Sequence, residues 1–181
     1  KILCDCLSIS GGWTPMVHMH TQSGGKLDFR EIDQVFVPSE KSENHINVGS
    51  CNGDFELEEI VKNTNNKVKK FLNINESGFD KISVLCSKEL EKKNIWLLPN
   101  TISEGKTKSF IDFQNDSTTK DIKLALREGF KSIEHVKRYT TTGMATDQGK
   151  LSNMHALGII ADTAGVKTVS YTHLRAHETI Q

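Results

Sequence analysis

Apolar positions along this chain concentrate in two blocks, with a polar stretch between them. In the first block, residues 1–10 are rich in Ile, Leu and Cys and end at a glycine pair, which is typical of a buried strand. Residues 26–38 have the pattern of one or two further strands. Residues 46–72 predict a short strand, a turn with glycine and an amphipathic helix. This order of elements predicts an α/β unit over residues 1–72.

The second block, residues 109–165, has the spacing of short helices. Thr118 and Asp121 form a capping-box pattern ahead of an apolar face that includes Ile122. Ser132 can cap a second helix, and a third follows a glycine-containing turn. We therefore expect this block to form a small all-α module.

Composition and charge narrow the class of protein. The formal net charge is zero with 25% charged residues, so no long-range field indicates binding to nucleic acid or to an anionic membrane. No run of about 18 apolar residues predicts a transmembrane helix. Residues 73–108 are rich in Asn, Lys, Ser and Glu and predict a linker or variable segment. The chain opens in a predicted strand and without a signal peptide, so we expect a piece of a longer cytoplasmic protein.

The cysteines and two late histidines raise the question of a metal. The spacing of the cysteines fits neither a disulfide framework nor a zinc module. Cys4 and Cys6 face the same way on a strand, and two buried thiols are favoured over a metal pair. His173 and His177 have a helical metal-ligand spacing, but no third ligand accompanies them. We therefore expect no metal site.

The segment SGGWTP, residues 10–15, is the first candidate binding segment. Two glycines after a strand allow the backbone to approach a ligand closely, and Trp13 can stack on a flat ring. Alternatively, the segment is a strand-end turn whose Trp13 fills the core. The residues leave both interpretations open.

The segment EHVKRYTTTGMATDQGK, residues 134–150, is the second candidate. A helix that ends in Lys137 and Arg138 places cations at its negative end, and the threonines and glycine after it suit a turn. In the functional interpretation, Lys131, Arg138 and Lys150 converge on a phosphate or carboxylate. The residues by themselves favour the helix-to-helix turn.

Three longer stretches together resemble one family. They are DCLSISGGWTPMVHMHTQSGGKL, VGSCNGDFEL and FIDFQNDSTTKDIKLALREGFKSIEHVKRYTTTGMATDQGKLSNMHALGI. They resemble the alpha subunit of heterotetrameric sarcosine oxidase. The resemblance implies that residues 1–72 are the C-terminal part of a Rossmann-like dinucleotide-binding domain and that residues 109–165 are a small helical module. Residues 166–181 include a stretch similar to translated sequencing-adapter sequence, so we expect a non-native tail.

The resemblance also implies an activity, cofactors and partners. It implies an oxidoreductase subunit for oxidative demethylation of sarcosine to glycine, with transfer of the one-carbon unit to tetrahydrofolate and production of hydrogen peroxide. The subunit would bind NAD and work with FMN and FAD carried mainly by the beta subunit, in a complex with beta, gamma and delta subunits. Tetrahydrofolate would bind outside this chain, which we expect to be inactive alone.

Two sets of residues would contact the cofactors, by resemblance. The NAD side would be lined by Ser10, Gly11, Gly12, Trp13 and Pro15. The FMN phosphate would be contacted by Lys137, Arg138 or Lys150.

Two alternatives belong to other classes of protein. One is a subunit of a related opine- or amine-oxidising flavoenzyme, and the other is a non-catalytic electron-transfer accessory module. Relatives with a [2Fe–2S] cluster need four Cys thiolates, and residues 109–165 contain no Cys, so we expect no iron–sulfur cluster there. Ser50 follows Gly49 where related dinucleotide domains often have Asp, which leaves an FAD-type ribitol contact unsupported.

Overall fold

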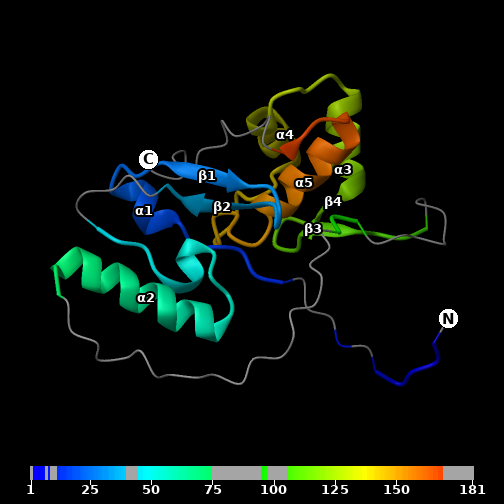
Figure 1. Ribbon diagram of the computed structural model, residues 1–181. Helices are drawn as coiled ribbons and strands as arrows, with labels where there is room; N and C mark the ends of the chain where they lie inside the picture. Colours follow the sequence, from blue (N-terminus) through cyan, green and yellow to red (C-terminus); the bar gives the residue numbers. More distant parts are fainter. Residues whose placement is uncertain are drawn as a thin grey trace. The chain divides into compact units, whose positions relative to one another are not determined.

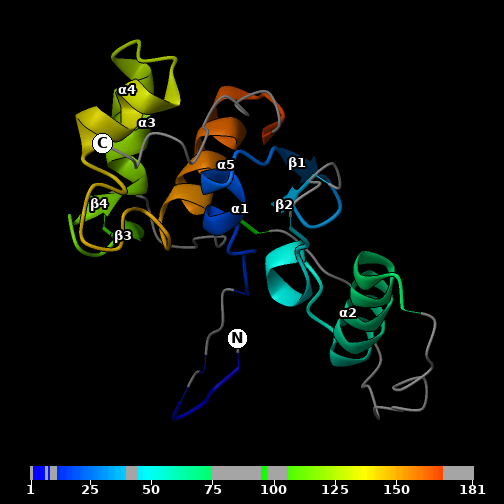
Figure 2. The same cartoon turned by 90° about the vertical axis from the view of Figure 1, so that its left-hand side faces the viewer.

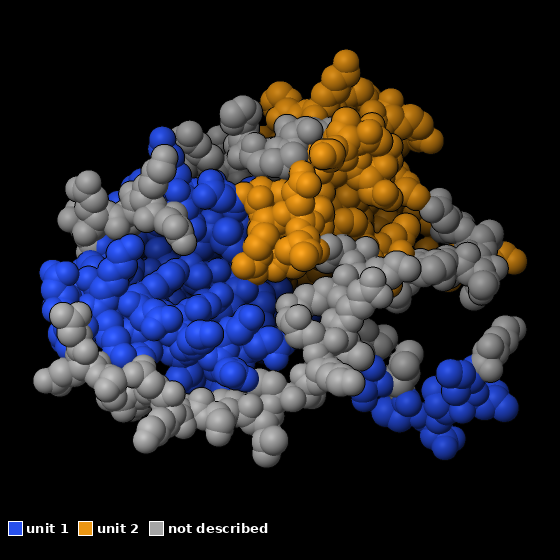
Figure 3. Space-filling view, viewed as in Figure 1, with its two compact units in different colours: residues 1–28, 36–87 blue, residues 29–35, 88–181 orange. Residues whose placement is uncertain are grey.

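The computed structural model of this chain describes residues 2–6, 8, 12–39, 45–74, 95–97 and 106–168. The chain divides into two compact units, coloured separately in Figure 3. Unit 1 comprises residues 1–28 and 36–87, and unit 2 comprises residues 29–35 and 88–181. The chain contains helices and small two-stranded sheets, so the prediction that it mixes α and β structure is confirmed.

Unit 1 contains two α-helices, a 3-10 helix and most of a β-hairpin (Figure 1). In chain order these are α1 (His18–Gln22), β1 (Leu27–Arg30), β2 (Val35–Pro38), η1 (Gly49–Asn52) and α2 (Leu57–Leu72). The residues that join β1 to β2 are grouped with unit 2.

His20 joins several segments of unit 1. Its side chain is 2% exposed, and its ring Nε2 lies 2.8 Å from the carbonyl oxygen of Lys26. A carbonyl can only accept, so Nε2 carries the proton and Nδ1 is the acceptor. The Nδ2 atom of Asn47 lies 2.9 Å from this Nδ1, and the Nε2 atom of His45 lies 2.8 Å from it. One buried imidazole therefore connects α1, the start of β1 and the segment before η1.

The predicted amphipathic helix of unit 1 is confirmed as α2. Glu58 and Glu59 lie in its first turn, where carboxylates complement the helix dipole, and Lys69 and Lys70 lie in its last turn. Asn73 ends the helix in the left-handed conformation, with φ of 53°. The strand predicted ahead of this helix is absent: residues 45–48 are irregular and lead into η1.

The buried strand predicted for residues 1–10 is wrong over the residues that the structure describes. Residues 2–6 and 8 are irregular, and the side chains of Ile2 and Leu3 are exposed. An apolar run forms a buried strand only where a neighbouring strand supplies hydrogen bonds and cover. Here β1 pairs with β2, and the described part of unit 1 offers residues 2–6 no strand of their own. The Rossmann-like assignment of residues 1–72 stays a prediction.

Unit 2 contains three helices that pack together and one small sheet. The helices are α3 (Thr119–Arg127), α4 (Ile133–Thr140) and α5 (Asn153–Ala164), and α3 packs on both of the others (Figures 1 and 2). The strands β3 (Phe110–Asp112) and β4 (Ser117–Thr118) pair antiparallel, with Phe110 opposite Thr118. The all-α character predicted for residues 109–165 is therefore not confirmed, because the segment before α3 forms a small antiparallel sheet ahead of the three helices.

Capping signals predicted the starts of α3 and α4 correctly. The Asp121 carboxylate accepts hydrogen bonds from the Thr118 backbone N–H at 2.8 Å and from the Thr118 hydroxyl at 2.7 Å, so α3 starts at the predicted capping box. Gly129, with φ of 96°, follows the end of α3. Ser132 is the N-cap residue of α4, and Gly165 ends α5 with φ of 66°.

The core of unit 2 lies between α3, α4 and α5. Its members share helical spacing and almost complete burial: Ile122, Ala125, Ile133, Val136, Leu157, Ile160 and Ala161. Ile122 belongs to the apolar face that the sequence predicts for the first of these helices. Burying each Ile or Leu stabilises the fold by about 1.5–3 kcal/mol. Among the described helices, none is both long enough and apolar enough to cross a bilayer.

Gly25→Ala tests the arrangement around His20. A Cβ on Gly25 would overlap the buried His20 imidazole, which would have to leave its bonds to Lys26 and Asn47. We expect Gly25→Ala to lower the free energy of unfolding by about 2 kcal/mol. Gly24→Ala is the control, because a Cβ there meets no atom within 4 Å and adds only the strain of φ at 83°. Chemical denaturation of both variants measures the difference, and equal losses would contradict this packing.

Candidate functional site

Asp112, at the end of β3, is the most connected carboxylate among the described residues. Its side chain is only 4% exposed. Its Oδ1 atom accepts hydrogen bonds from the backbone N–H groups of Gln114 at 2.9 Å and Asn115 at 3.2 Å. Its Oδ2 atom accepts from the backbone N–H of Gly143 at 2.8 Å and from Asn115 Nδ2 at 3.3 Å. One carboxylate therefore connects the β3–β4 turn to a residue thirty-one positions further along the chain.

These contacts set the protonation of Asp112. Burial alone would raise the pKa of this carboxyl. The backbone N–H groups of Gly143, Asn115 and Gln114, with the side-chain amide of Asn115, outweigh burial and lower the pKa below its ordinary value. Asp112 is therefore ionised at neutral pH, and its charge is held by four donors.

Residues 140–143, which we call the Thr-Gly turn, follow α4 directly. The hydroxyl of Thr140 donates to the carbonyl of Val136 at 2.8 Å, as a last-turn contact of the helix. The hydroxyls of Thr140 and Thr142 lie 2.8 Å apart. Thr141 ends α4 in the left-handed conformation, and Gly143 follows with φ of 72°. The polar groups of the turn thus largely satisfy one another, as the interpretation as a helix-to-helix turn requires.

The β3–β4 turn holds the Thr-Gly turn from the other side. Asn115 Nδ2 donates to the carbonyl of Thr141 at 2.8 Å, and Ser117 Oγ donates to the carbonyl of Thr140. Further along, the Gln114 Oε1 atom accepts from the backbone N–H of Thr146 at 3.1 Å and from its hydroxyl at 2.7 Å. Two turns that are distant in sequence therefore form one rigid polar assembly.

Asn153, the first residue of α5, fills the space inside the loop before that helix. A Cβ on Gly143 or on Gly149 would overlap the Asn153 side chain, so both positions require glycine for space as well as for positive φ. The Oδ1 atom of Asn153 and the Oγ atom of Ser152 are buried and have no protein hydrogen-bond partner within the described part of the chain. The loop is therefore packed closely onto the start of α5.

The four predicted cations flank the Thr-Gly turn in sequence and are not joined by any contact that the described residues show. Lys137 lies 3.7 Å from the carboxylate of Glu134, one turn earlier on α4. Arg138 and Lys150 are exposed, on either side of the Thr-Gly turn, and neither forms an ion pair with another described residue. Lys131, before α4, is also exposed. A shared anion site needs a ligand to bring these side chains together.

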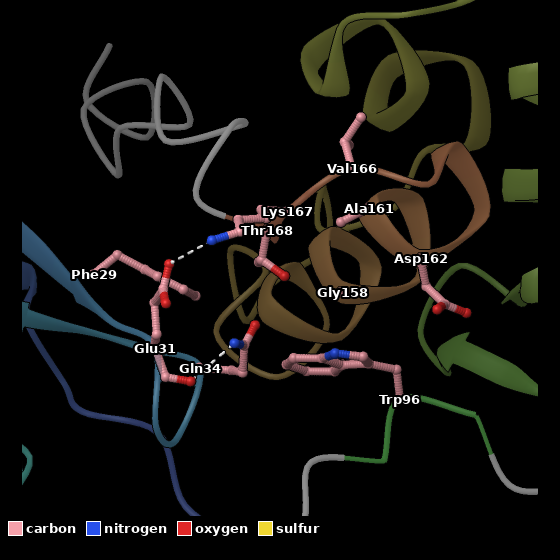
Figure 4. Close-up of a pocket in the computed structure, with 10 residues that line it drawn as sticks. All are labelled: Phe29, Glu31, Gln34, Trp96, Gly158, Ala161, Asp162, Val166, Lys167 and Thr168. Carbon is pink, nitrogen blue, oxygen red and sulfur yellow. Dashed lines mark hydrogen bonds and ion pairs between the residues drawn. The ribbon is translucent and has the colours of Figure 1, made fainter.

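Sequence reasoning missed a hollow in unit 2. It has a volume of about 210 Å³ and lies between α5, Trp96 and the turn between β1 and β2 (Figure 4). The Trp96 ring packs where a Cβ on Gly158 would be, and the Trp96 carbonyl is bonded to His155. Glu31 and Lys167, on the rim, are 3.5 Å apart. The sequence signal for this contact is Gly158 within the apolar run Ala156–Ala161 of α5. Because rim charges of both signs are present, the hollow has no single preferred ligand charge.

Comparison with known proteins decides the family. The profile described as Sarcosine oxidase A3 domain matches residues 106–177. The chain is 32% identical over 170 residues to sarcosine oxidase subunit alpha of Corynebacterium sp. (strain U-96) and 34% identical over 171 residues to that of Rhizobium meliloti (strain 1021). These matches cover 90% and 91% of the chain. The chain belongs to the sarcosine oxidase alpha-subunit family. It spans 17% of the length of each of these relatives.

The matched A3 domain of the sarcosine oxidase alpha-subunit family contains the whole Asp112 assembly. Residues 106–177 include β3, β4, the Thr-Gly turn and all three helices of unit 2. The resemblance stated from the sequence is thus confirmed. The segment 134–150 lies within the matched domain, and in this structure it comprises most of α4 followed by a turn fixed by internal hydrogen bonds.

The predicted NAD-side residues lie in unit 1 or outside the described residues. Ser10 and Gly11 lie outside the described residues. Gly12 has φ of 87° and open space around its Cα, and Trp13 is 81% exposed. Within the described residues Trp13 therefore fills no core, and its role in ligand stacking stays a prediction. Pro15 is buried just before α1.

The prediction of two buried thiols is also wrong. Cys4 and Cys6 are both exposed, because the segment that carries them is irregular. Among the described residues, no group of three or more His, Cys, Asp or Glu side chains could hold a metal ion. The histidines of the HLRAH stretch, His173 and His177, lie outside the described residues.

Asp112→Asn tests the carboxylate at the centre of the assembly. In the wild type, N–H donors face both carboxylate oxygens. The substitution replaces one of these oxygens with an NH2 group, so at least one donor loses its acceptor. We expect the free energy of unfolding at neutral pH to fall by about 2 kcal/mol, measured by chemical denaturation. A loss below about 0.5 kcal/mol, typical of surface substitutions, would contradict the role given to Asp112.

Lowering the pH tests the same carboxylate without a substitution. The folded-state pKa of Asp112 lies below the unfolded value of about 3.9, so the unfolded state takes up the proton first as the pH falls. Its contribution to stability is complete above about pH 4 and is lost as the pH falls through the folded-state pKa. We expect the difference in unfolding free energy between wild type and Asp112→Asn to shrink over that range. A difference that stays constant to about pH 2 would contradict the assignment.

Gly143→Ala tests the packing of the loop onto α5. The new methyl group would overlap the Asn153 side chain, and it would also be strained by the positive φ of Gly143. Gly129→Ala is a matched control, because Gly129 has φ of 96° and open space. We expect thermal denaturation to show a larger loss for Gly143→Ala, by about 1–3 kcal/mol over the control. Equal losses would show that Asn153 does not fill the loop.

Proposed function

We propose that this chain is part of the alpha subunit of a sarcosine oxidase. The observation that carries the proposal is the identity of 32–34% to sarcosine oxidase alpha subunits across 90% of the chain or more. The complete subunit would work in a complex with beta, gamma and delta subunits in the cytoplasm. The chain described here would be inactive by itself, because it spans 17% of the relatives' length.

The proposed reaction is the oxidative demethylation of sarcosine. The N-methyl group loses a hydride to a flavin held mainly by the beta subunit, oxygen takes up the two electrons to give hydrogen peroxide, and tetrahydrofolate accepts the one-carbon unit. This chain would contribute binding surfaces and no catalytic residue. On the NAD side, the open backbone at Gly12 and the exposed ring of Trp13 fit close approach and stacking of a flat ligand.

The surface around the Thr-Gly turn suits a phosphate, and we propose it as the FMN-phosphate contact. Arg138 and Lys150 are exposed cations on a rigid polar assembly, and Lys137 is adjacent on α4. Lys150 also lies two residues before Ser152, the N-cap residue of α5, where a helix dipole favours an anion. The charge of Lys137 is partly offset by Glu134, so Arg138 and Lys150 are the main contributors.

Oxygen consumption by the complete enzyme tests the proposed reaction. The full-length subunit, produced with its partner subunits, should consume oxygen with sarcosine and release one hydrogen peroxide per turnover. Added tetrahydrofolate should lower the amount of free formaldehyde, because it accepts the one-carbon unit. If the enzyme oxidises an opine or another amine but not sarcosine, this proposal is wrong. The chain would then belong to the related opine- or amine-oxidising flavoenzyme. No turnover of any amine would favour the accessory module.

Arg138→Ala in the complete enzyme tests the phosphate contact. Loss of a charge-assisted hydrogen bond to a phosphate should lower flavin content or sarcosine turnover roughly tenfold. Arg127→Ala is the matched control, since Arg127 is an exposed arginine at the far end of α3 and lies outside the Thr-Gly turn. Normal FMN content and turnover in Arg138→Ala would rule out the contact while leaving the oxidase proposal intact.

A further inference from the structure

The helix α2 has an apolar side that the described residues leave largely uncovered. Its apolar residues, which we call the α2 stripe, are Leu57, Ile60, Val61, Val68, Phe71 and Leu72. At 100° per residue they span an arc of about 120°, and the lysines and glutamates occupy the opposite arc. None of the helix's 16 residues is buried. A helix with this pattern is expected to bury its stripe against another element.

Only one edge of the α2 stripe faces the rest of unit 1. A Cβ built on Gly49 would contact the Ile60 side chain at 3.7 Å, and Lys67 Nζ donates to the carbonyl of Asn47 at 3.1 Å. Both contacts lie on the same edge of the helix. Phe71, near that edge, is nevertheless 48% exposed, and Leu72, at the other edge of the arc, is 54% exposed. The stripe therefore offers a continuous apolar surface beyond the contact with η1.

Unit 1 also lacks a core of its own among the described residues. Val17, Pro15 and Pro38 are the buried apolar side chains in its described part, whereas unit 2 buries ten or more apolar side chains. The large apolar side chains that unit 1 exposes include Trp13, Met16, Met19, Leu57, Phe71, Leu72 and Ile74. A domain is stable because its layers bury their apolar faces against each other. Unit 1 has the outer elements of such a domain and little of its interior.

We propose that the α2 stripe is an internal docking surface, covered by a part of the same polypeptide that lies outside residues 1–181. The length of the relatives supports this occupant, since this chain spans 17% of each of them. An isolated 16-residue helix is marginal in water, so α2 needs that cover to persist. The same cover supplies the core that unit 1 lacks. The proposal rests on family membership and contacts, and it holds whichever amine the enzyme oxidises.

Hydrogen exchange in the complete enzyme tests whether the stripe is covered. Amides of residues 57–72 should exchange on the order of 100-fold more slowly than in a synthetic peptide of residues 55–74. A peptide serves as the reference because it needs no fold. Exchange in the enzyme at the rate of the peptide would show that nothing covers α2, and it would overturn the proposal.

Cross-linking of the complete enzyme distinguishes the occupant. The lysines of α2 are Lys62, Lys67, Lys69 and Lys70. In a sample that mixes isotope-labelled and unlabelled alpha subunits, their links should join α2 to segments of the same alpha chain outside residues 1–181. Links mainly within residues 1–181 would count against the proposal. Links mainly to another subunit would assign the stripe to a partner, and links between labelled and unlabelled chains would assign it to a second copy. Either result would overturn the proposal.

A matched pair of substitutions gives an independent measurement. Phe71→Gln introduces a polar amide into the stripe. Asn66→Gln introduces the same residue on the opposite, solvent-exposed side of α2. In the complete enzyme, Phe71→Gln should lower the melting temperature by several degrees, and Asn66→Gln should leave it unchanged. If Phe71→Gln prevents production of the alpha subunit while Asn66→Gln does not, the proposal is also supported. Equal behaviour of the two variants would contradict it.

Discussion

The A3 part of this chain depends on one ionised carboxylate. Asp112 ends a three-residue strand and receives hydrogen bonds from its own turn and from Gly143, beyond α4. A buried charge is costly unless it is hydrogen-bonded, and here four donors meet that requirement. Displacing the β3–β4 turn or the Thr-Gly turn would remove hydrogen-bond donors from the buried carboxylate. The two turns are therefore held in one relative geometry. Helix packing then follows, because α3, α4 and α5 all begin or end near these turns.

This constraint also explains the structural role of the Thr-Gly turn. Polar groups of the Thr-Gly turn form hydrogen bonds with one another and with the β3–β4 turn, so most of their hydrogen-bonding capacity is satisfied within the protein. What it presents to other molecules is the pair of exposed cations beside it, Arg138 and Lys150. A phosphate would therefore bind to side chains whose backbone is already held in place by hydrogen bonds. Such preorganisation lowers the entropy cost of binding.

Local signals predicted unit 2 better than unit 1, for physical reasons. Capping at Thr118 and the apolar face around Ile122 act within a few residues, so the sequence alone located the helices. The bond from Gly143 to Asp112 joins distant residues, and no spacing rule indicates it. The segment around Ile2 has the composition of a strand, but strand formation depends on a neighbour that these residues do not provide. Its Rossmann-like assignment therefore rests on resemblance, and the completed core proposed for unit 1 would account for the difference.

The central claim is that ionised Asp112 holds Gly143, and nuclear magnetic resonance of the Gly143 amide tests it most directly. A proton donated to a buried carboxylate should resonate downfield and shift when that carboxylate titrates. The account predicts that the Gly143, Gln114 and Asn115 amides shift together, with one midpoint below the ordinary aspartate range of about 3.9. A Gly143 amide that does not titrate, or that follows a midpoint at or above that value, would contradict the account.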